Sequence, residues 1–230
     1  MAKKKVEGAE KSIESVEHAL SRTERYIEEN QKSLTIIVLA ITVIVVGFTL
    51  YKRYIVGPKE VEAQSQMFVA EQYFEADSFN LALYGDGNNM GFIEIIDEYG
   101  ITKSANLSNY YAGISFLHLG EFEDAIDYLK DFDSKDEMVS SVATGAIGDA
   151  FLELGKEKDA LSMYLKAAKQ RKNDFTSPIY YMKAGQLYEY RNEYKKALGV
   201  YEIIKKDFPE SSEAQDIDKF IANVKTKIEE

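Results

Sequence analysis

The stretch LGEFEDAIDYLK, residues 119–130, decides the fold because its pattern occurs three times in the chain. Residues 154–166 read LGKEKDALSMYLK, and residues 191–202 read RNEYKKALGVYE. The alanines of the three copies, Ala125, Ala160 and Ala197, lie 35 and 37 residues apart. A period of this size indicates stacked helical hairpins, each of which buries its apolar face against the next one.

Residues near the repeated phrase explain how each hairpin would close. Each hairpin has a small residue that lets its first helix approach the second one; in chain order these are Gly113, Gly148 and Gly185. Each hairpin also has a bulky residue that fills the space between its helices; in chain order these are Phe116, Phe151 and Tyr188. Gly120 and Gly155 can adopt a positive φ and end the first helix, and Asn192 tolerates the same conformation.

The pattern resembles the tetratricopeptide repeat (TPR), a helical-hairpin repeat of about 34 residues. We therefore predict an all-α fold, with an α-solenoid of TPR hairpins behind a single N-terminal transmembrane helix. Three repeats occupy residues 105–210, and a degenerate first hairpin with an insertion occupies residues 60–104. In that first hairpin, a helical pattern over 60–84 is followed by a partner helix at 91–100.

Residues 211–230 are predicted to form a cap helix that solvates the open end of the stack. Its apolar stripe contains Ile217, Phe220, Ile221, Val224 and Ile228, with lysine and glutamate on the opposite side. Ser212 and Gln215 have the spacing of a capping box, which predicts that the helix begins beside them.

Residues 33–51, SLTIIVLAITVIVVGFTLY, carry no charge and lie between Lys32 and Lys52. A helix of about 20 residues crosses the ~30 Å hydrocarbon core of a bilayer. The stretch lacks the polar face of a soluble helix, and it lies behind too long a charged leader for a cleaved signal peptide. We predict a single uncleaved anchor, surrounded by membrane lipid, over residues 33–54.

Residues 1–32 contain seven basic and seven acidic residues and residues 33–51 contain none, so the net charge of −11 belongs to residues 52–230. An amphipathic helix is predicted here from a seam in steps of three and four: Val6, Ala9, Ile13, Val16, Leu20, Thr23, Ile27, Asn30 and Leu34. Two interpretations remain open, a solvated helix lying on the membrane and a docking helix for a membrane partner.

Lys3, Lys4 and Lys5 favour a cytoplasmic N-terminus, because short cytoplasmic segments carry an excess of positive charge. The charges close to the anchor do not choose a side, since three basic residues flank each end. We expect an extracytoplasmic C-terminal domain, with the opposite topology as the alternative.

Composition excludes several classes of function. The chain has no cysteine, which removes disulfides, thiol catalysis and cysteine-ligated zinc. Its acidic balance argues against a nucleic-acid partner, because phosphate binding needs a basic surface. The phosphate-binding glycine loop and the hydrolase and metalloprotease motifs are absent from the sequence. We therefore expect no enzyme activity, no catalytic residue, no cofactor and no metal.

The stretch YGDGNNMG, residues 84–91, is rich in the glycine and asparagine of flexible turns. Asp86, Asn88, Gly91 and Asp97 fall at calcium-loop spacing, but Met90 occupies a ligand position and Asp97 replaces the usual glutamate. We interpret the stretch as a structural turn, with a partner-contact loop as the alternative.

In the TPR family, the first helix of each pair lines a concave groove that binds partners. The resemblance places the following residues in that groove: Tyr110, Ile114, Leu117, His118, Asp149, Leu152, Glu153, Met182, Gln186, Glu189 and Tyr190. Lys183 is the one candidate for a carboxylate clamp of the kind that binds chaperone C-termini. An extended apolar or basic segment is therefore the better expectation for the ligand. Simple packing against adjacent helices is the alternative for each residue.

The whole architecture resembles the YfgM-like family of bacterial inner-membrane proteins. The segments VEHAL, YIEENQK, AEQYFEADSFNLALYGDGNN and YYAGISFLHLGEFEDAIDYLK are similar to its Bacteroidetes-type members. The resemblance implies a single-pass protein of the inner membrane with a periplasmic TPR domain. It also implies a role ancillary to the Sec translocon and partnership with Sec subunits, exported polypeptides and a PpiD-like periplasmic chaperone. The alternative is a TPR scaffold in another envelope machine, such as secretion, gliding or outer-membrane assembly.

Overall fold

A computed structural model describes the backbone of residues 2–230 and the side chains of residues 27–230. The regular secondary structure of the described residues is helical, with turns and loops between the helices, and these residues contain no strand. The chain divides into two compact units, Met1–Gly57 and Pro58–Glu230. Each unit is described by itself.

The first unit contains helix α1, Ala2–Tyr51, followed by a π-helical turn η1, Lys52–Val56. The predicted anchor is therefore the end of a longer helix that also includes the N-terminal segment. Most positions of its amphipathic seam, 6–23, lie outside the residues whose side chains are described.

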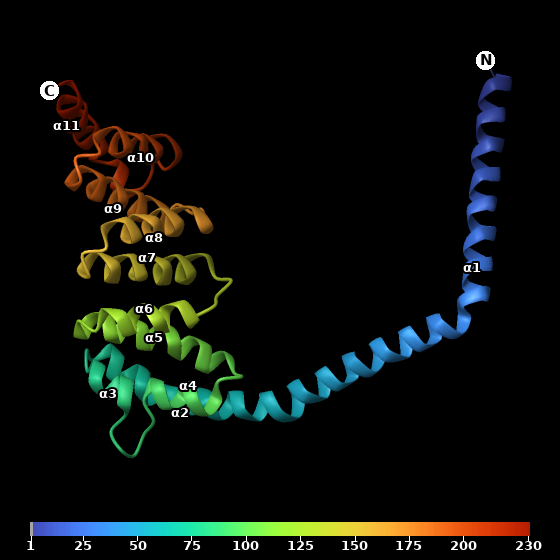
Figure 1. Ribbon diagram of the computed structural model, residues 1–230, viewed down its shortest axis with the longest axis horizontal. Coiled ribbons are helices and arrows are strands. Elements are labelled where there is room, and N and C mark those ends of the chain that lie inside the picture. The colour runs from blue at the N-terminus through green and yellow to red at the C-terminus, as the bar shows by residue number, and fades with distance from the viewer. Residues whose placement is uncertain (1) are drawn as a thin grey trace. The chain divides into compact units, whose positions relative to one another are not determined.

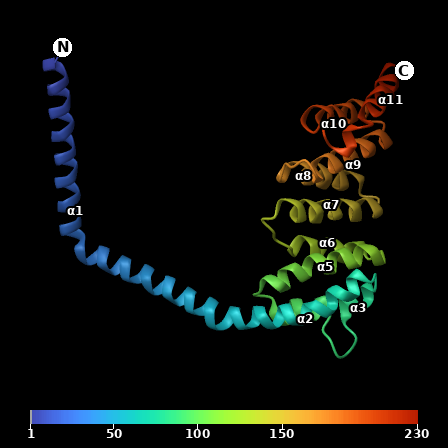
Figure 2. The same cartoon turned by 180° about the vertical axis from the view of Figure 1, so that it is seen from behind.

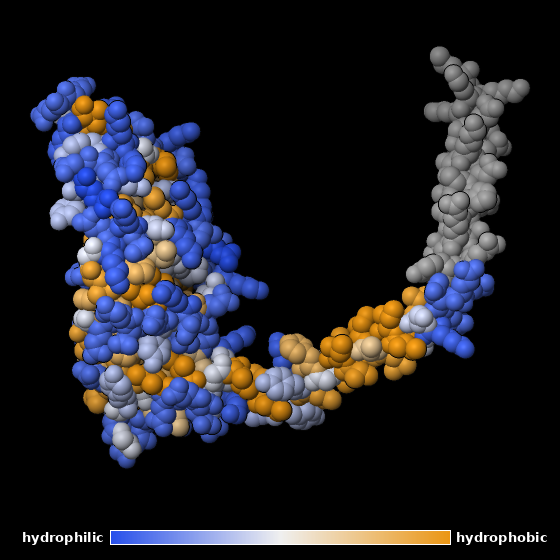
Figure 3. Space-filling view, viewed as in Figure 1, coloured by the Kyte–Doolittle hydropathy of each residue, from blue (hydrophilic) through white to orange (hydrophobic). Residues whose placement is uncertain are grey.

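The apolar part of α1 is exposed along its length and forms the hydrophobic surface in Figure 3. Its three threonines satisfy their hydroxyls inside the helix. Thr35, Thr42 and Thr49 each donate to the backbone carbonyl four residues earlier, at 2.7–2.8 Å. A span in lipid needs such internal partners, because no water is available to the hydroxyls there. The helix is long and apolar enough to cross a membrane.

The second unit is a stack of antiparallel helices (Figures 1 and 2). Three pairs form its centre: α5 Lys103–Leu119 with α6 Phe122–Asp131, α7 Glu137–Glu153 with α8 Glu157–Gln170, and α9 Thr176–Tyr190 with α10 Tyr194–Asp207. Each of these helices contacts the next one in the chain. The predicted all-α solenoid is therefore confirmed.

The turns inside the three pairs have the predicted backbone conformation. Gly120, Gly155 and Asn192 have φ values of +80°, +70° and +58°. The next amide in each turn donates back to the carbonyl five residues earlier, at 2.8–2.9 Å. This Schellman arrangement satisfies carbonyls that the helix end would leave unpaired, so the turn residues end the first helix of each pair.

The small residues allow close helix approach, as predicted. A Cβ added to Gly113 would lie 2.5 Å from Leu129 Cγ, and one added to Gly148 would lie 2.7 Å from Tyr164 Cε1. At Gly185 the corresponding distance, to Tyr201 Cε1, is 2.2 Å. A large side chain of the second helix therefore occupies the space that each glycine leaves free.

The first hairpin differs from the prediction. Helix α2, Gly57–Glu75, ends at a left-handed turn in which Asp77 has a φ of +54°. Ser78 N–H donates to the Tyr73 carbonyl at 2.8 Å, so this turn matches the turns of the later pairs. Its partner is the short α3, Phe79–Tyr84, where Ala82 is fully buried like the alanines of the repeats.

The segment predicted as the partner helix forms α4, Phe92–Tyr99, an additional helix that packs against α5. The helical pattern over 60–84 is therefore interrupted rather than continuous. Glu60 of α2 accepts hydrogen bonds from the Lys103 and Ser104 amides, which joins the first hairpin to the start of α5.

The cap helix α11, Ile217–Glu229, buries its predicted apolar stripe against α10. Ile217, Ile221 and Val224 are buried, and Phe220 and Ile228 pack at the edge of the same cluster. The predicted capping box of Ser212 and Gln215 is wrong. Ser211, rather than Ser212, caps the preceding 3-10 turn η2, Ser212–Ala214, and Asp216 precedes α11 without a side-chain cap bond.

Candidate protein-interaction site

A pocket of about 470 Å³ opens between α7, α8 and α9. Residues of the second and third hairpins line it: Asp149, Leu152, Tyr164, Lys183, Gln186, Leu187 and Tyr190. Four of these, Asp149, Leu152, Gln186 and Tyr190, are in the groove set expected from the sequence. The fold therefore brings them together from two different repeats.

The polar side of the pocket is organised around the Asp149 carboxylate. Tyr164 donates its hydroxyl to Asp149 Oδ1 at 2.6 Å, and Lys183 Nζ lies 2.7 and 2.8 Å from the two carboxylate oxygens. Burial, and then the hydrogen bond to Asp149, raise the pKa of Tyr164 well above its usual value. The tyrosine therefore stays neutral and acts as a donor at physiological pH.

Lys183 is held from two sides. Its ammonium pairs with Asp149 and lies 5.5 Å from the centre of the Tyr164 ring and 5.9 Å from that of the Tyr180 ring. Since the charge is already balanced by Asp149, the lysine offers little to an incoming carboxylate. Lys183 therefore forms part of the charge-balanced wall of the pocket.

The apolar side of the pocket is formed by Leu152, Leu187 and Tyr190. Leu187 is buried, Leu152 is 38% exposed and Tyr190 is 74% exposed. An exposed tyrosine beside an exposed leucine offers a partner contact area without first breaking a packed core. Gln186 is also exposed, and its amide can donate to and accept from a peptide backbone.

The groove residues predicted on α5 do not reach this pocket. Tyr110, Ile114 and Leu117 pack against the cluster between the first and second pairs. His118 is exposed, and its ring stacks on Phe79 of α3 with the centroids 4.5 Å apart. Each of these four side chains therefore contacts a neighbouring helix, and His118 stays exposed beside its contact.

Three further predicted residues have other surroundings. Met182 packs against the buried cluster of the C-terminal hairpins, and Glu153 is exposed at the end of α7. Glu189 accepts a hydrogen bond from the Tyr201 hydroxyl at 2.7 Å and pairs with Lys227 of α11 at 3.3 Å. Glu189 thus ties α9 to the helices that follow it.

The loop between α3 and α4 is a structural turn built on Asp86. Its carboxylate accepts from the Asn88 and Asn89 amides, the Asn89 side chain and the Tyr73 hydroxyl, at 2.7–2.9 Å. These donors hold the pKa of Asp86 well below its usual value. No group of three or more potential metal ligands occurs among the described residues.

Three lining residues were not in the predicted groove set. Tyr164 lies on the second helix of its pair, 16 residues after Gly148, and Tyr201 follows Gly185 by the same interval. Each tyrosine reaches over its glycine and donates to an acid of the first helix. The repeated glycine–tyrosine spacing was therefore a usable signal, whereas Lys183 and Leu187 needed the packing of α9 on α7.

The comparisons with known proteins agree with this fold. A tetratricopeptide repeat family model matches residues 180–211, which include most of α9 and all of α10. No curated protein matches the chain.

Two solved structures resemble the solenoid. One is a protein of Podosopora anserina assigned as a kinesin light chain, with nearly identical TPR-like repeats. It is 12% identical to this chain, with a TM-score of 0.53, and the match covers 73% of this chain and 87% of that protein. The other is the MamA protein, 17% identical, with a TM-score of 0.52, over 73% and 88% of the two chains. At these identities the likeness concerns the fold alone.

Proposed function

We propose that this chain is a membrane-anchored interaction protein that holds an extended segment of a partner in the α7–α9 pocket. The observation that carries the proposal is the pocket itself, in which exposed apolar side chains surround a fixed polar group. TPR solenoids generally serve as protein-interaction scaffolds, which supports the proposal.

The chemistry of the pocket favours an apolar segment with a basic neighbour. Leu152, Leu187 and Tyr190 can receive an aliphatic or aromatic side chain, and Gln186 can pair with the partner's backbone. Glu153 is exposed beside Leu152 at the end of α7, so its carboxylate adds negative charge next to the opening. A lysine or arginine next to the apolar side chain would meet that potential.

A peptide-binding measurement tests the pocket. Leu152→Ala and Tyr190→Ala each remove apolar contact area, and we expect each to weaken binding of an apolar-basic peptide about 5- to 30-fold. Leu81→Ala is the matched control, because Leu81 is 40% exposed but lies on α3, away from the pocket. An equal loss of peptide affinity in all three variants would contradict the proposal that the pocket binds the peptide.

Residues 33–54 are the proposed membrane anchor, with the N-terminus in the cytoplasm of a bacterial cell and the solenoid in the periplasm. The internally bonded threonines and the exposed apolar surface of α1 support the insertion. Protease treatment of spheroplasts tests the orientation. Digestion of the solenoid is expected, and its protection would reverse the topology.

The finer assignment is an ancillary subunit of the Sec translocon that helps exported polypeptides or recruits a PpiD-like chaperone. It rests on the resemblance to the YfgM-like family and on a pocket suited to segments that are not yet folded. Affinity purification of the full chain in mild detergent tests it. Recovery of translocon subunits is the expected result, and recovery of gliding, secretion or outer-membrane assembly proteins instead would favour the alternative scaffold role.

A further inference from the structure

The three hairpin turns lie at equivalent positions of the repeats but carry different charges. The first turn, residues 119–124, has three acidic residues and no basic one. In the second turn, residues 154–159, two lysines balance two acids, and in the third, residues 191–196, three basic residues accompany one acid. The turn edge of an acidic protein therefore becomes basic towards its C-terminal end.

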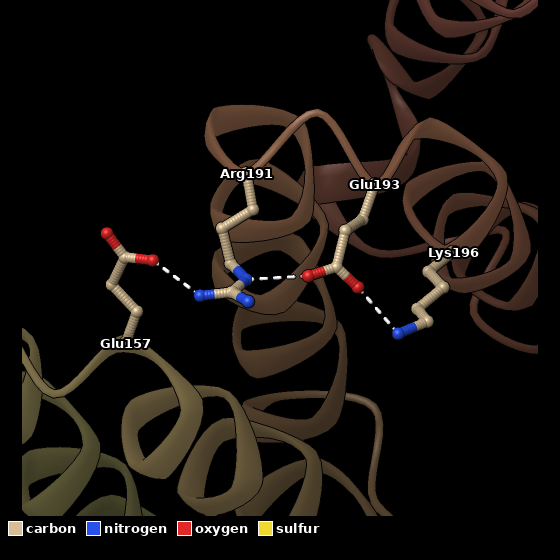
Figure 4. Close-up of polar contacts among 4 residues, drawn as sticks. All are labelled: Glu157, Arg191, Glu193 and Lys196. Atoms are coloured by element: carbon tan, nitrogen blue, oxygen red, sulfur yellow. Dashed lines mark hydrogen bonds and ion pairs between the residues drawn. The ribbon is translucent and has the colours of Figure 1, made fainter.

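Ion pairs connect the second and third turns into one surface. Arg191 of the third turn pairs with Glu157 of the second turn and, at 2.7 Å, with Glu193 of its own turn. Glu193 also pairs with Lys196, so four side chains form a continuous chain across the two hairpins (Figure 4). These contacts link the two turns, whose relative position is set by the packing of α8 against α9.

Several cations on this surface remain available. Within residues 27–230, Lys156, Lys158 and Lys195 are exposed and have no ion-pair partner. They line two shallow hollows beside the Arg191 network. Arg191 and Lys196 share the Glu157 and Glu193 carboxylates, so the surface as a whole keeps a positive excess.

Aromatic rings hold some of these ammonium groups in place. Among the available lysines, Lys156 Nζ lies 5.9 Å from the centre of the Phe151 ring; Lys196 Nζ, which is already paired with Glu193, lies 5.6 Å from that of Tyr188. A lysine that is already ordered loses less conformational entropy when it pairs with a ligand. The surface is thus partly preorganised for anionic groups.

We propose that the turn edge formed by residues 154–159 and 191–196 docks an acidic polypeptide segment of a partner protein. The site is separate from the α7–α9 pocket, so a scaffold could hold one partner at its edge and another in its pocket. The alternation of signs favours a polypeptide over an anionic bilayer. Glu157, Asp159 and Glu193 would face a flat layer of lipid headgroups unfavourably, whereas a peptide can place its carboxylates between them.

The test uses the full chain in a zwitterionic detergent and a fluorescent 15-residue peptide that contains six glutamates. Binding is followed by fluorescence anisotropy, with the glutamine version of the peptide as its control. An exposed ion pair changes affinity by roughly 1.5- to 5-fold, so the triple reversal Lys156→Glu, Lys158→Glu, Lys195→Glu should weaken binding at least about tenfold. Binding should also fall as the salt concentration rises.

The matched control is Lys135→Glu, Lys169→Glu, Lys206→Glu, which changes the net charge equally. These three exposed lysines lie outside the hairpin turns. They are at or beyond the far ends of α6, α8 and α10. Unchanged binding in this control supports the proposal. Equal loss in both triple variants, equal binding of the glutamine peptide, or preferential binding to vesicles of anionic lipid would overturn it.

Discussion

Replacing Gly185 with alanine should destabilise the solenoid, although alanine is the better helix former. The added Cβ would lie 2.2, 2.7 and 2.9 Å from three atoms of the Tyr201 ring. Tyr201 is fully buried, and its hydroxyl donates to Glu189 at 2.7 Å. The ring can therefore give way only by disturbing the core or by losing that hydrogen bond.

The expected magnitude follows from three contributions. Overpacking a core costs about 1–3 kcal/mol, and weakening a buried hydrogen bond to a charged acceptor costs about 1.5–3 kcal/mol. Helix propensity returns about 1 kcal/mol when alanine replaces glycine. Gly185→Ala should therefore lower the free energy of unfolding by about 1–4 kcal/mol, with the hydrogen bond only partly lost.

Denaturant unfolding of the full chain in detergent, followed by circular dichroism at the helical band, measures this change. Gly199→Ala is the matched control, because an added Cβ there meets nothing within 4 Å. The control should gain about 0.5–1 kcal/mol from helix propensity. A Gly185→Ala chain as stable as the wild type, or more stable, would refute the account of close helix packing.

Three further predictions concern turns and pocket. Asn192→Ala should lower the free energy of unfolding by about 1 kcal/mol, because φ at this position is positive. Asn192→Gly should not lower it, and denaturant unfolding of both variants checks the difference. The pKa of Asp86 is lowered in the folded chain, so its stabilising effect is present above the ordinary carboxyl pKa and lost as pH falls. The protection factors of the Asn88 and Asn89 amides, which are the intrinsic exchange rates divided by the observed rates at the same pH, should accordingly fall on acidification or in Asp86→Asn, and unchanged protection would contradict this. Tyr190→Ala should change the free energy of unfolding by less than about 0.5 kcal/mol, as its side chain is largely exposed; a larger loss in thermal unfolding would assign the residue to the core.

Much of the fold could be predicted because it depends on local rules repeated three times. The positive φ at Gly120, Gly155 and Asn192 follows from residue type, and so does the need for small residues opposite large ones. The turn between α2 and α3 is harder to recognise in the sequence, because Asp77 occupies the position that glycine or asparagine holds in the later pairs. The insertion after α3 then made α4 look like the missing partner helix.

The candidate site was predictable only in part, because its composition depends on contacts between repeats. Asp149 and Tyr190 could be placed by their register on the first helices of two pairs. The pairing of Lys183 with Asp149, 34 residues away, depends on how α9 packs against α7. The position of α3 beside α5 likewise explains why His118 stacks on Phe79 instead of facing an open groove.

The central claim is that the α7–α9 pocket holds a partner segment while the chain is anchored in the membrane. Site-specific photo-crosslinking in native membranes tests it directly, with the photoreactive residue at Gln186 in one variant and at exposed Lys135 in another. The account predicts partner adducts from position 186 that decrease when Tyr190→Ala is added, and few adducts from position 135. Equal crosslinking at the two positions, or none at 186, would contradict it.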